Sequence, residues 1–251
     1  MGFLAAAAVF LAYLLLRWRW SGRPMLESLA LDFARLYASL WHRWSGRRSP
    51  LAAQGPAILV SNHTCSADPA FLLAGSPRLF GFLASRAHYN LHPLTRKLLN
   101  WMGCVPVTRN GRDAAAARAA LRRLAEGKVL CVFPEGNLSG VRRGRLRAAK
   151  HGVAFLALAS RAPVYPAYIA GGPRTEKLLQ AWLWPWGRAV RVHYGPPADL
   201  SPYYDKPRTR KLLAEVTEVL MRQVAALAPA KGGHHEVRNG KRADRKALRP
   251  L

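Results

Sequence analysis

Acidic residues and cysteines are both scarce in this sequence. Only 13 Asp and Glu stand against 39 Lys and Arg, which leaves a formal net charge of +26 at pH 7. A surface of that charge attracts nucleic acid, anionic lipid headgroups or an acidic carrier protein, so charge alone does not choose among these partners. The cysteines Cys65, Cys104 and Cys131 are too few and wrongly spaced for a disulfide framework or a CxxC metal site. This cysteine usage favours a reducing compartment.

The sequence also lacks an uninterrupted apolar run of full membrane-spanning length. Its longest run, residues 3–16, has fourteen apolar residues, whereas a spanning helix needs about 20. No charged side chain precedes the run and no A-x-A-like site follows it, which argues against a cleaved signal peptide. The next residues, Arg17-Trp18-Arg19-Trp20, suit a headgroup interface with the positive flank on the cytoplasmic side. We expect a membrane anchor here and leave open whether it crosses the bilayer.

A second apolar pattern follows Pro24. Its residues recur at three- and four-residue spacings, which is the period of one helical face. They are Leu26, Leu29, Phe33, Leu36, Tyr37, Leu40, Trp41 and Trp44. We interpret the segment as an interfacial helix lying on the membrane, and the alternative is a helix whose apolar face packs on the protein's own core. Residues 45–50 are predicted to be a linker, so we divide the chain into residues 1–48, 49–228 and 229–251.

From residue 51 onward, short apolar runs alternate with helical patterns and no internal repeat is found. This order predicts an α/β fold with a mostly parallel central sheet flanked by helices, preceded by an N-terminal membrane-docking helical pair. Predicted strands cover residues 57–60, 79–84, 104–108, 129–133, 164–169 and 189–194. Predicted helices cover residues 69–74, 92–102, 112–126, 146–160 and 208–227. Residues 229–251 are basic and without periodicity, so we expect a disordered tail.

Polar residues follow the first predicted strand. Asn62 and His63 come directly after it, and Asp68 follows His63 with four residues between them. A neutral imidazole that is held by a carboxylate at one ring nitrogen keeps the other nitrogen free to act as a general base. The simpler interpretation is a helix start, with Asp68 as the N-cap and Pro69 at the first helical position.

Two more strand ends carry charged residues. The segment Phe133-Pro134-Glu135-Gly136 precedes a run of cations, and Arg109 follows the strand over residues 104–108. An arginine fork at such a place can hold a phosphate or a carboxylate. The simpler alternatives are a surface turn for the first segment and a solvated basic loop for the cations.

Taken together, these elements resemble the glycerolipid acyltransferase family, over roughly residues 51–195. Asn62, His63 and Asp68 fit the family's NHx4D motif, and residues 103–109 fit its GxxxxxR segment. Residues 133–136 fit the start of FPEGTRS, and residues 162–169 are similar to the VPVxPV element. The two N-terminal helical segments also resemble the membrane-docking pair of bacterial members. The order and spacing of four coincident motifs carry this resemblance.

The resemblance implies transfer of a fatty acyl group from a thioester, acyl-ACP or acyl-CoA, to a hydroxyl of a lysolipid such as 1-acylglycerol-3-phosphate. His63 would be the general base and Asp68 would orient its ring. The residues expected to bind substrate are Asn62, Arg109, Glu135, Gly136, Ser139, Arg142 and Arg145. No cofactor and no metal are implied. The expected location is the cytoplasmic face of the cell inner membrane, on an anionic lipid surface, as part of phospholipid synthesis.

One position departs from the family pattern. Leu138 stands where the family has an arginine that is associated with the acceptor's phosphate. Arg142 or Arg145 could supply that charge from a few residues on, and an acceptor without a phosphate is the alternative. Two other hypotheses come from different classes. Cys65 could act as an acylated nucleophile activated by His63, and the charge of +26 could serve nucleic-acid binding, although no signature of a nucleic-acid-binding domain is found.

Overall fold

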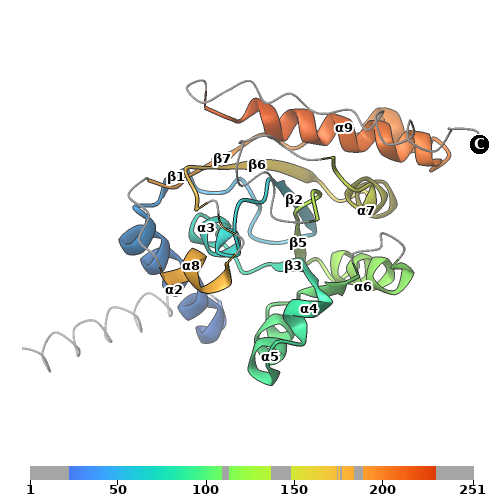
Figure 1. Cartoon of the computed structure of the whole chain (residues 1–251). Helices are drawn as coiled ribbons and strands as arrows, with labels where there is room; N and C mark the ends of the chain where they lie inside the picture. The colour runs from blue at the N-terminus through green and yellow to red at the C-terminus, as the bar shows by residue number, and fades with distance from the viewer. Residues whose placement is uncertain are drawn as a thin grey trace, which may run out of the picture.

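A seven-stranded sheet forms the centre of the protein (Figure 1). The structure is a computed structural model, which describes residues 23–108, 113–136, 148–173, 175, 177–183 and 189–229. The strands lie in the order β1-β7-β6-β2-β5-β3-β4. Their bounds are β1 Ser45–Gly46, β2 Ala57–Ser61, β3 Gly81–Ser85, β4 Val105–Val107, β5 Val129–Val132, β6 Val164–Ala170 and β7 Arg191–Tyr194.

All neighbouring strands are parallel except β6 and β7. The strands β2 and β5 are buried along their whole length, as expected where helices cover both faces of a parallel sheet. Because β2, β3, β5 and β6 run in the same direction, their carboxyl ends meet at one edge of the sheet. The predicted α/β class is confirmed, and each of the six predicted strands is present with ends shifted by no more than two residues.

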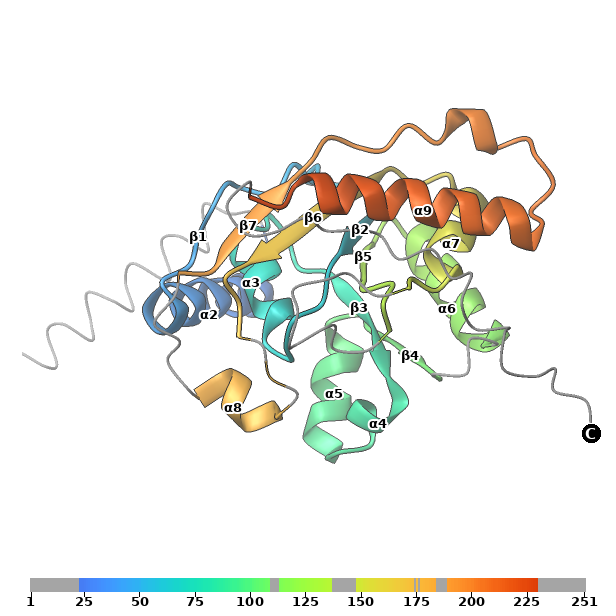
Figure 2. The same ribbon diagram turned by 45° about the horizontal axis from the view of Figure 1, so that its top comes forward.

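Helices cover the two faces of the sheet. Their bounds are α2 Met25–His42, α3 Asp68–Ala74, α4 Arg86–Tyr89, α5 Pro93–Trp101, α6 Ala114–Ala125, α7 Gly152–Ser160, α8 Leu178–Leu183 and α9 Arg210–Ala226. Side chains of β2 alternate between two buried clusters: Leu59 packs with α2 and α3, whereas Ile58 and Val60 pack with α6, α7 and α9. Figure 2 shows α9 on one side of the molecule and α2, α8 and α5 on the other.

The predicted linker over residues 45–50 is wrong. Ser45 and Gly46 form β1, which pairs with β7, and the Ser49 main-chain N–H donates to the carbonyl of Gly75 at 2.8 Å. Arg43 has a φ of 47° and turns the chain out of α2 towards the sheet. Because this edge strand is held by main-chain hydrogen bonds, its side chains carry no strand pattern that a sequence could show.

The helix α2 packs on the core, but through the face opposite to its apolar stripe. Leu31, Ala34 and Ala38 are buried, and the Arg35 guanidinium donates to the carbonyls of Ala74 and Ser76. The alternative interpretation, in which the stripe itself covers the core, is therefore wrong for most of the stripe: Phe33 is 63% exposed, and of the eight stripe residues only Tyr37 and Trp44 pack against the core. None of the helices in the described ranges has the length and apolar character needed to cross a membrane.

The remaining predicted helices are present with shifted ends. The helix α7 begins at Gly152, so residues 148–151, which were expected to be helical, are not. The short helices α4 and α8 were not predicted, because four and six residues are too few to show a helical period. Residues 1–22 and 230–251 lie outside the described residues, so the predicted anchor and tail stay predictions.

Candidate active site

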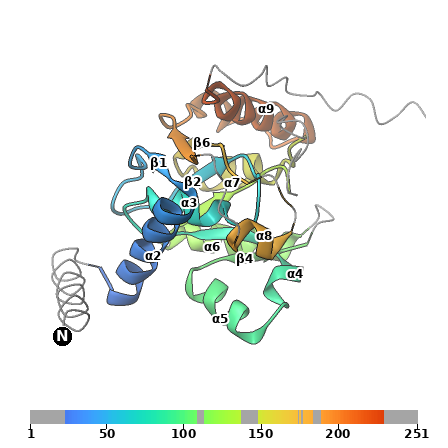
Figure 3. The same cartoon turned by 60° about the vertical axis from the view of Figure 1, so that its left-hand side comes forward.

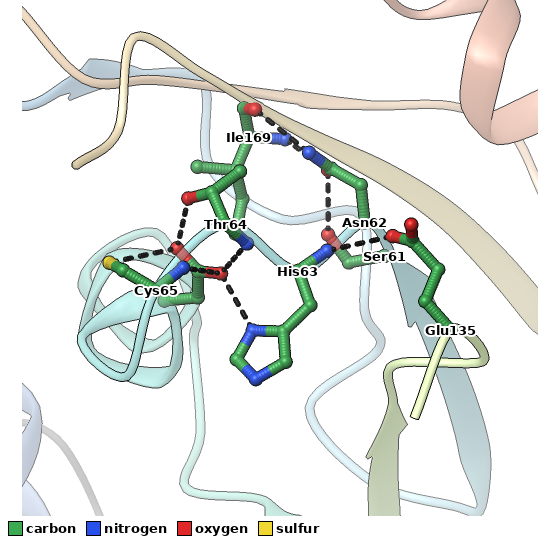
Figure 4. A network of polar contacts seen from close by, with 8 residues as sticks. Ser61, Asn62, His63, Thr64, Cys65, Glu135 and Ile169 are labelled. Carbon is green, nitrogen blue, oxygen red and sulfur yellow. Dashed lines mark hydrogen bonds and ion pairs between the residues drawn. The ribbon is translucent and has the colours of Figure 1, made fainter. Parts of the chain in front are cut away.

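The turn between β2 and α3 brings His63 and Asp68 into contact (Figure 4). The Nδ1 atom of His63 lies 2.8 Å from Oδ2 of Asp68, and the carboxylate is fully buried. In the neutral ring, Nδ1–H donates a hydrogen bond to this carboxylate, so Nε2 carries the lone pair. Figure 4 shows that the ring points away from the other polar contacts of the turn. The predicted pair is thus present in the geometry that a general base requires.

Asp68 binds the preceding loop and does not act as the helix cap. The interpretation of Asp68 as an N-cap is wrong, because α3 begins at Asp68 itself and the N-cap residue is Ala67. The Asp68 carboxylate accepts from the main-chain N–H groups of Thr64 and Cys65 and from the Thr64 hydroxyl at 2.8 Å. These donors satisfy a charge that has no solvent contact and fix the carboxylate beside the imidazole.

The aromatic ring of Phe133 fixes the imidazole of His63 from a second direction. The two rings stack with centroids 4.2 Å apart and an interplanar angle of 16°. Phe82, on β3, stacks in turn on Phe133 at 6.1 Å. Neither phenylalanine was among the predicted site residues. The signal that could have found Phe133 is its place as the first residue of the Phe133-Pro134-Glu135-Gly136 motif, directly after β5.

Glu135 holds the main chain of His63. Its Oε1 accepts from the His63 N–H at 3.1 Å, and the side chain is only 4% exposed. The next residue, Gly136, has a φ of +67°, a conformation that favours glycine. Its N–H donates to the Phe133 carbonyl and closes the turn that brings Glu135 towards β2.

Asn62 joins β2 to β6 at the same edge. Its Nδ2 donates to the Ile169 carbonyl at 3.1 Å, and its Oδ1 accepts from the Ile169 N–H at 2.8 Å. The nitrogen and the oxygen of the side-chain amide are therefore both hydrogen-bonded to the main chain of Ile169 on the neighbouring strand, and Asn62 is buried. This contact continues the β2–β6 pairing beyond Ser61, the last residue of β2, and sets the direction of the His63 turn.

Four predicted substrate-binding residues, Arg109, Ser139, Arg142 and Arg145, lie outside the described residues, as does Leu138. The two residues that flank the segment 109–112 are nevertheless tied to each other. Thr108 donates its N–H and its hydroxyl to Asp113, at 2.9 and 3.0 Å. Asp113 also caps α6 by accepting from the Ala116 N–H. These bonds, that of Ala116 first, lower the pKa of the Asp113 carboxyl to about 2.

The thiol of Cys65 is poorly suited to act as a nucleophile. Its Sγ is buried and lies 3.5 Å from Oδ1 of Asp68. Burial, and then the negative charge of Asp68, raise the pKa of this thiol, which keeps it protonated at neutral pH. Across the described ranges, no three His, Cys, Asp or Glu side chains gather as metal ligands would.

Comparisons with known proteins bear on the fold and the family of this chain. The structure is similar to the crystal structure of a 1-acyl-sn-glycerophosphate (LPA) acyltransferase from Thermotoga maritima, with a TM-score of 0.57 and 21% sequence identity over 90% of this chain and 92% of that one. A search of curated protein sequences finds no match. The family model described as Acyltransferase matches residues 45–170, which include β2, the His63 turn and the whole of β6. The chain therefore belongs to this acyltransferase family, in agreement with the resemblance of its motifs to the glycerolipid acyltransferases, and it is an enzyme of acyl transfer.

Proposed function

We propose that this enzyme moves a fatty acyl group from an acyl thioester, acyl-ACP or acyl-CoA, to a hydroxyl of a lysolipid in phospholipid synthesis. The first candidate acceptor is 1-acylglycerol-3-phosphate. The observation that carries the proposal is the contact between Nδ1 of His63 and Oδ2 of Asp68, which leaves Nε2 as a base. The family match supports acyl transfer as the reaction, and the resemblance of the motifs supports a lysolipid as the acceptor.

In the proposed reaction, Nε2 of His63 takes the proton of the acceptor hydroxyl while the hydroxyl oxygen bonds to the thioester carbonyl carbon. Asp68 stabilises the imidazolium that forms. When the tetrahedral intermediate collapses, the carbon–sulfur bond breaks and the proton on Nε2 goes to the leaving thiolate. The products are an ester and a free thiol. Because the thioester is already activated, no acyl group has to be held on the protein.

In this proposal, Asn62 and Glu135 position His63 and do not take part in the proton transfer. Glu135 holds the His63 main chain and Asn62 holds the end of β2, so both position the base. The acceptor's phosphate is assigned to the arginines predicted for it, Arg109, Arg142 and Arg145. Leu138 keeps open an acceptor without a phosphate, because it stands where the family has an arginine.

The proposed site of action is the cytoplasmic face of the cell inner membrane. The apolar run over residues 3–16 and the exposed stripe of α2 support it, since an amphipathic helix with such a stripe binds in the headgroup region. The charge of +26 supports an anionic lipid surface as the partner.

An acceptor panel tests the proposal. The full-length protein is mixed with an acyl thioester and, in turn, with lysophosphatidic acid, a zwitterionic lysolipid and an amine-bearing lipid, and both free thiol and acylated product are measured. We expect product with at least one lysolipid and the highest kcat/KM with lysophosphatidic acid. A preference for an acceptor that lacks a phosphate would assign the alternative, and hydrolysis without any acylated acceptor would contradict the proposal.

A further inference from the structure

Large exposed apolar side chains occur on only one part of the described structure. All of them belong to α2, to the segment formed by α4 and α5, or to α8. They are Met25, Leu26, Leu29, Phe33, Leu36, Leu40, Trp41, Leu91, Leu94, Leu98, Trp101, Leu179 and Leu183. By contrast, α6, α7 and α9 expose no large apolar side chain. Patches of this extent on a folded protein mark an interaction surface.

The α4–α5 segment carries a stripe that the proposed membrane anchor does not explain. Leu94, Leu98 and Trp101 recur at spacings of four and three residues, which aligns them along one side of α5, and Leu91 stands two residues before the helix. Leu94 is 66% exposed, and no residue of α5 is buried. The helix thus does not use its apolar side to pack on this domain.

This stripe and α8 flank the edge of the sheet that carries His63. The α4–α5 segment leaves the carboxyl end of β3, and α8 follows the carboxyl end of β6. In the sheet order β6-β2-β5-β3, the strands that hold His63 and Phe133 lie between those two. Figures 2 and 3 show α5 and α8 projecting on the same side of the molecule, away from α9.

The helix α8 is fastened to α2. The Tyr37 hydroxyl donates to the Trp182 carbonyl at 3.0 Å, and the two rings lie 5.0 Å apart. Trp41 Nε1 donates to the Leu183 carbonyl, also at 3.0 Å. The exposed leucines of α8 therefore extend the apolar stripe of α2 as one surface. The stripe of α5 forms a second surface across the sheet edge.

We propose that the α4–α5 stripe is a second membrane contact, which together with α2 and α8 seats the His63 edge of the sheet against an anionic bilayer. The contact rests on the proposed function, since a lysolipid acceptor lies in such a bilayer. Charge complementarity favours a bilayer as the occupant, because Arg96 and Lys97 are exposed on the same helix. The surface of α2 and α8 across the sheet edge favours it too, since the apolar residues 3–16 precede α2 in the sequence.

Two separate contacts have a consequence for catalysis. A single amphipathic helix lets the domain tilt on the membrane, whereas contacts on both sides of β2 and β5 hold the sheet edge towards the lipid. The acceptor's hydroxyl then reaches Nε2 of His63 from the headgroup layer while its acyl chain stays among the lipid chains. This avoids transfer of the chain through water, which is unfavourable for each CH₂ group that is exposed.

Site-specific labelling tests the second contact. The three native cysteines are buried, so a cysteine introduced at an exposed position reacts selectively with an environment-sensitive fluorophore. We would label Leu98→Cys on α5, Leu40→Cys on α2 and, as the control on α9, Arg222→Cys. Vesicles of phosphatidylglycerol and phosphatidylcholine, with and without spin-labelled acyl chains, are then added to the full-length protein.

We expect the labels at positions 98 and 40 to shift to the blue and to be quenched by the spin-labelled lipid, and the label at position 222 to do neither. A position 98 label that stays in water while position 40 enters the bilayer overturns the proposal. So does a blue shift at position 98 that depends on protein concentration without lipid, because a second copy would then be the occupant.

A partition measurement provides an independent test. The double variant Leu94→Ser, Leu98→Ser should bind these vesicles about tenfold more weakly, because two exposed leucines leave the interface. The matched control Thr95→Ser, Asn100→Ser, on the same helix but off the stripe, should bind as the unaltered protein does. Equal binding by both variants contradicts the second contact. Acyl transfer in detergent micelles, measured alongside, reports on the proposed function separately, because micelles do not require the two contacts.

Discussion

The imidazole of His63 lies flat against the ring of Phe133, with the two centroids 4.2 Å apart. Phe133 directly follows β5 and His63 lies two residues beyond the end of β2, so the stack joins the carboxyl ends of two neighbouring strands. Asp68 fixes the ring through Nδ1 and Glu135 fixes the main chain through its N–H. The base is therefore held at its edge, its face and its backbone, which leaves few orientations open to Nε2.

Loss of the stacking ring should slow the reaction without weakening substrate binding. The variant Phe133→Ala is expected to lower kcat about threefold to tenfold, since an aromatic pair contributes roughly 0.5–1.5 kcal/mol. Phe133→Tyr keeps the ring and should restore most of the rate. Steady-state kinetics of thiol release check this. A rise in KM at unchanged kcat would show that Phe133 binds substrate and does not position the base.

Loss of the negative charge at Asp68 should lower kcat much more than loss of the Phe133 ring. Asp68→Asn keeps the size of the side chain, but its neutral amide has no negative charge to stabilise an imidazolium, and its NH2 group donates to Nδ1 in the wrong tautomer of the ring. We expect kcat to fall roughly 10³-fold. Circular dichroism shows whether the variant is folded, because the same side chain accepts from Thr64 and Cys65. A folded variant that retains more than a tenth of the rate would remove Asp68 from the mechanism.

Asn62 should stabilise the folded protein. Asn62→Ala leaves the Ile169 N–H and carbonyl without their partners at a buried position. We expect the free energy of unfolding to fall by about 2–4 kcal/mol. Urea unfolding measures it, with the exposed Asn100→Ala as control, which should change stability by less than about 0.5 kcal/mol. Equal free energies of unfolding for both variants would mean that the hydrogen bonds between Asn62 and Ile169 do not stabilise the fold.

The native cysteines should resist alkylation at pH 8. Burial raises the pKa of the Cys104 thiol to about 11, and burial together with the charge of Asp68 raises that of Cys65. A thiol is neutral and unreactive below its pKa, so reaction of Cys104 should grow only as the pH approaches about 11. Mass spectrometry after iodoacetamide treatment reads this out. Cys65→Ala should keep its activity, and an acyl group trapped on Cys65 would revive the nucleophile hypothesis.

Much of the fold follows from patterns in the chain. The central strands could be predicted because their burial leaves continuous apolar runs between helical periods. The contact of His63 with Asp68 could also be predicted, because four intervening residues at a strand end return the chain on itself. The catalytic role of the pair stays a prediction.

Other features have no signature in one sequence. The strand β1 depends on main-chain pairing with β7, so the side chains of Ser45 and Gly46 give no indication of it. The buried face of α2 has one large apolar residue, Leu31, beside the small residues Ala34 and Ala38, which a search for large apolar residues passes over. The stack of Phe133 on His63 depends on which strands are neighbours, and neighbours are set by the fold as a whole.

The most direct test of the account is thiol release by His63→Ala. With acyl thioester and lysophosphatidic acid in detergent micelles, the variant should lose at least about 10³-fold in rate, because no other group takes the hydroxyl proton. The exposed His88→Ala serves as the matched control and should keep the full rate. Acyl transfer by folded His63→Ala at a rate close to that of His88→Ala would contradict the central claim that His63 is the base.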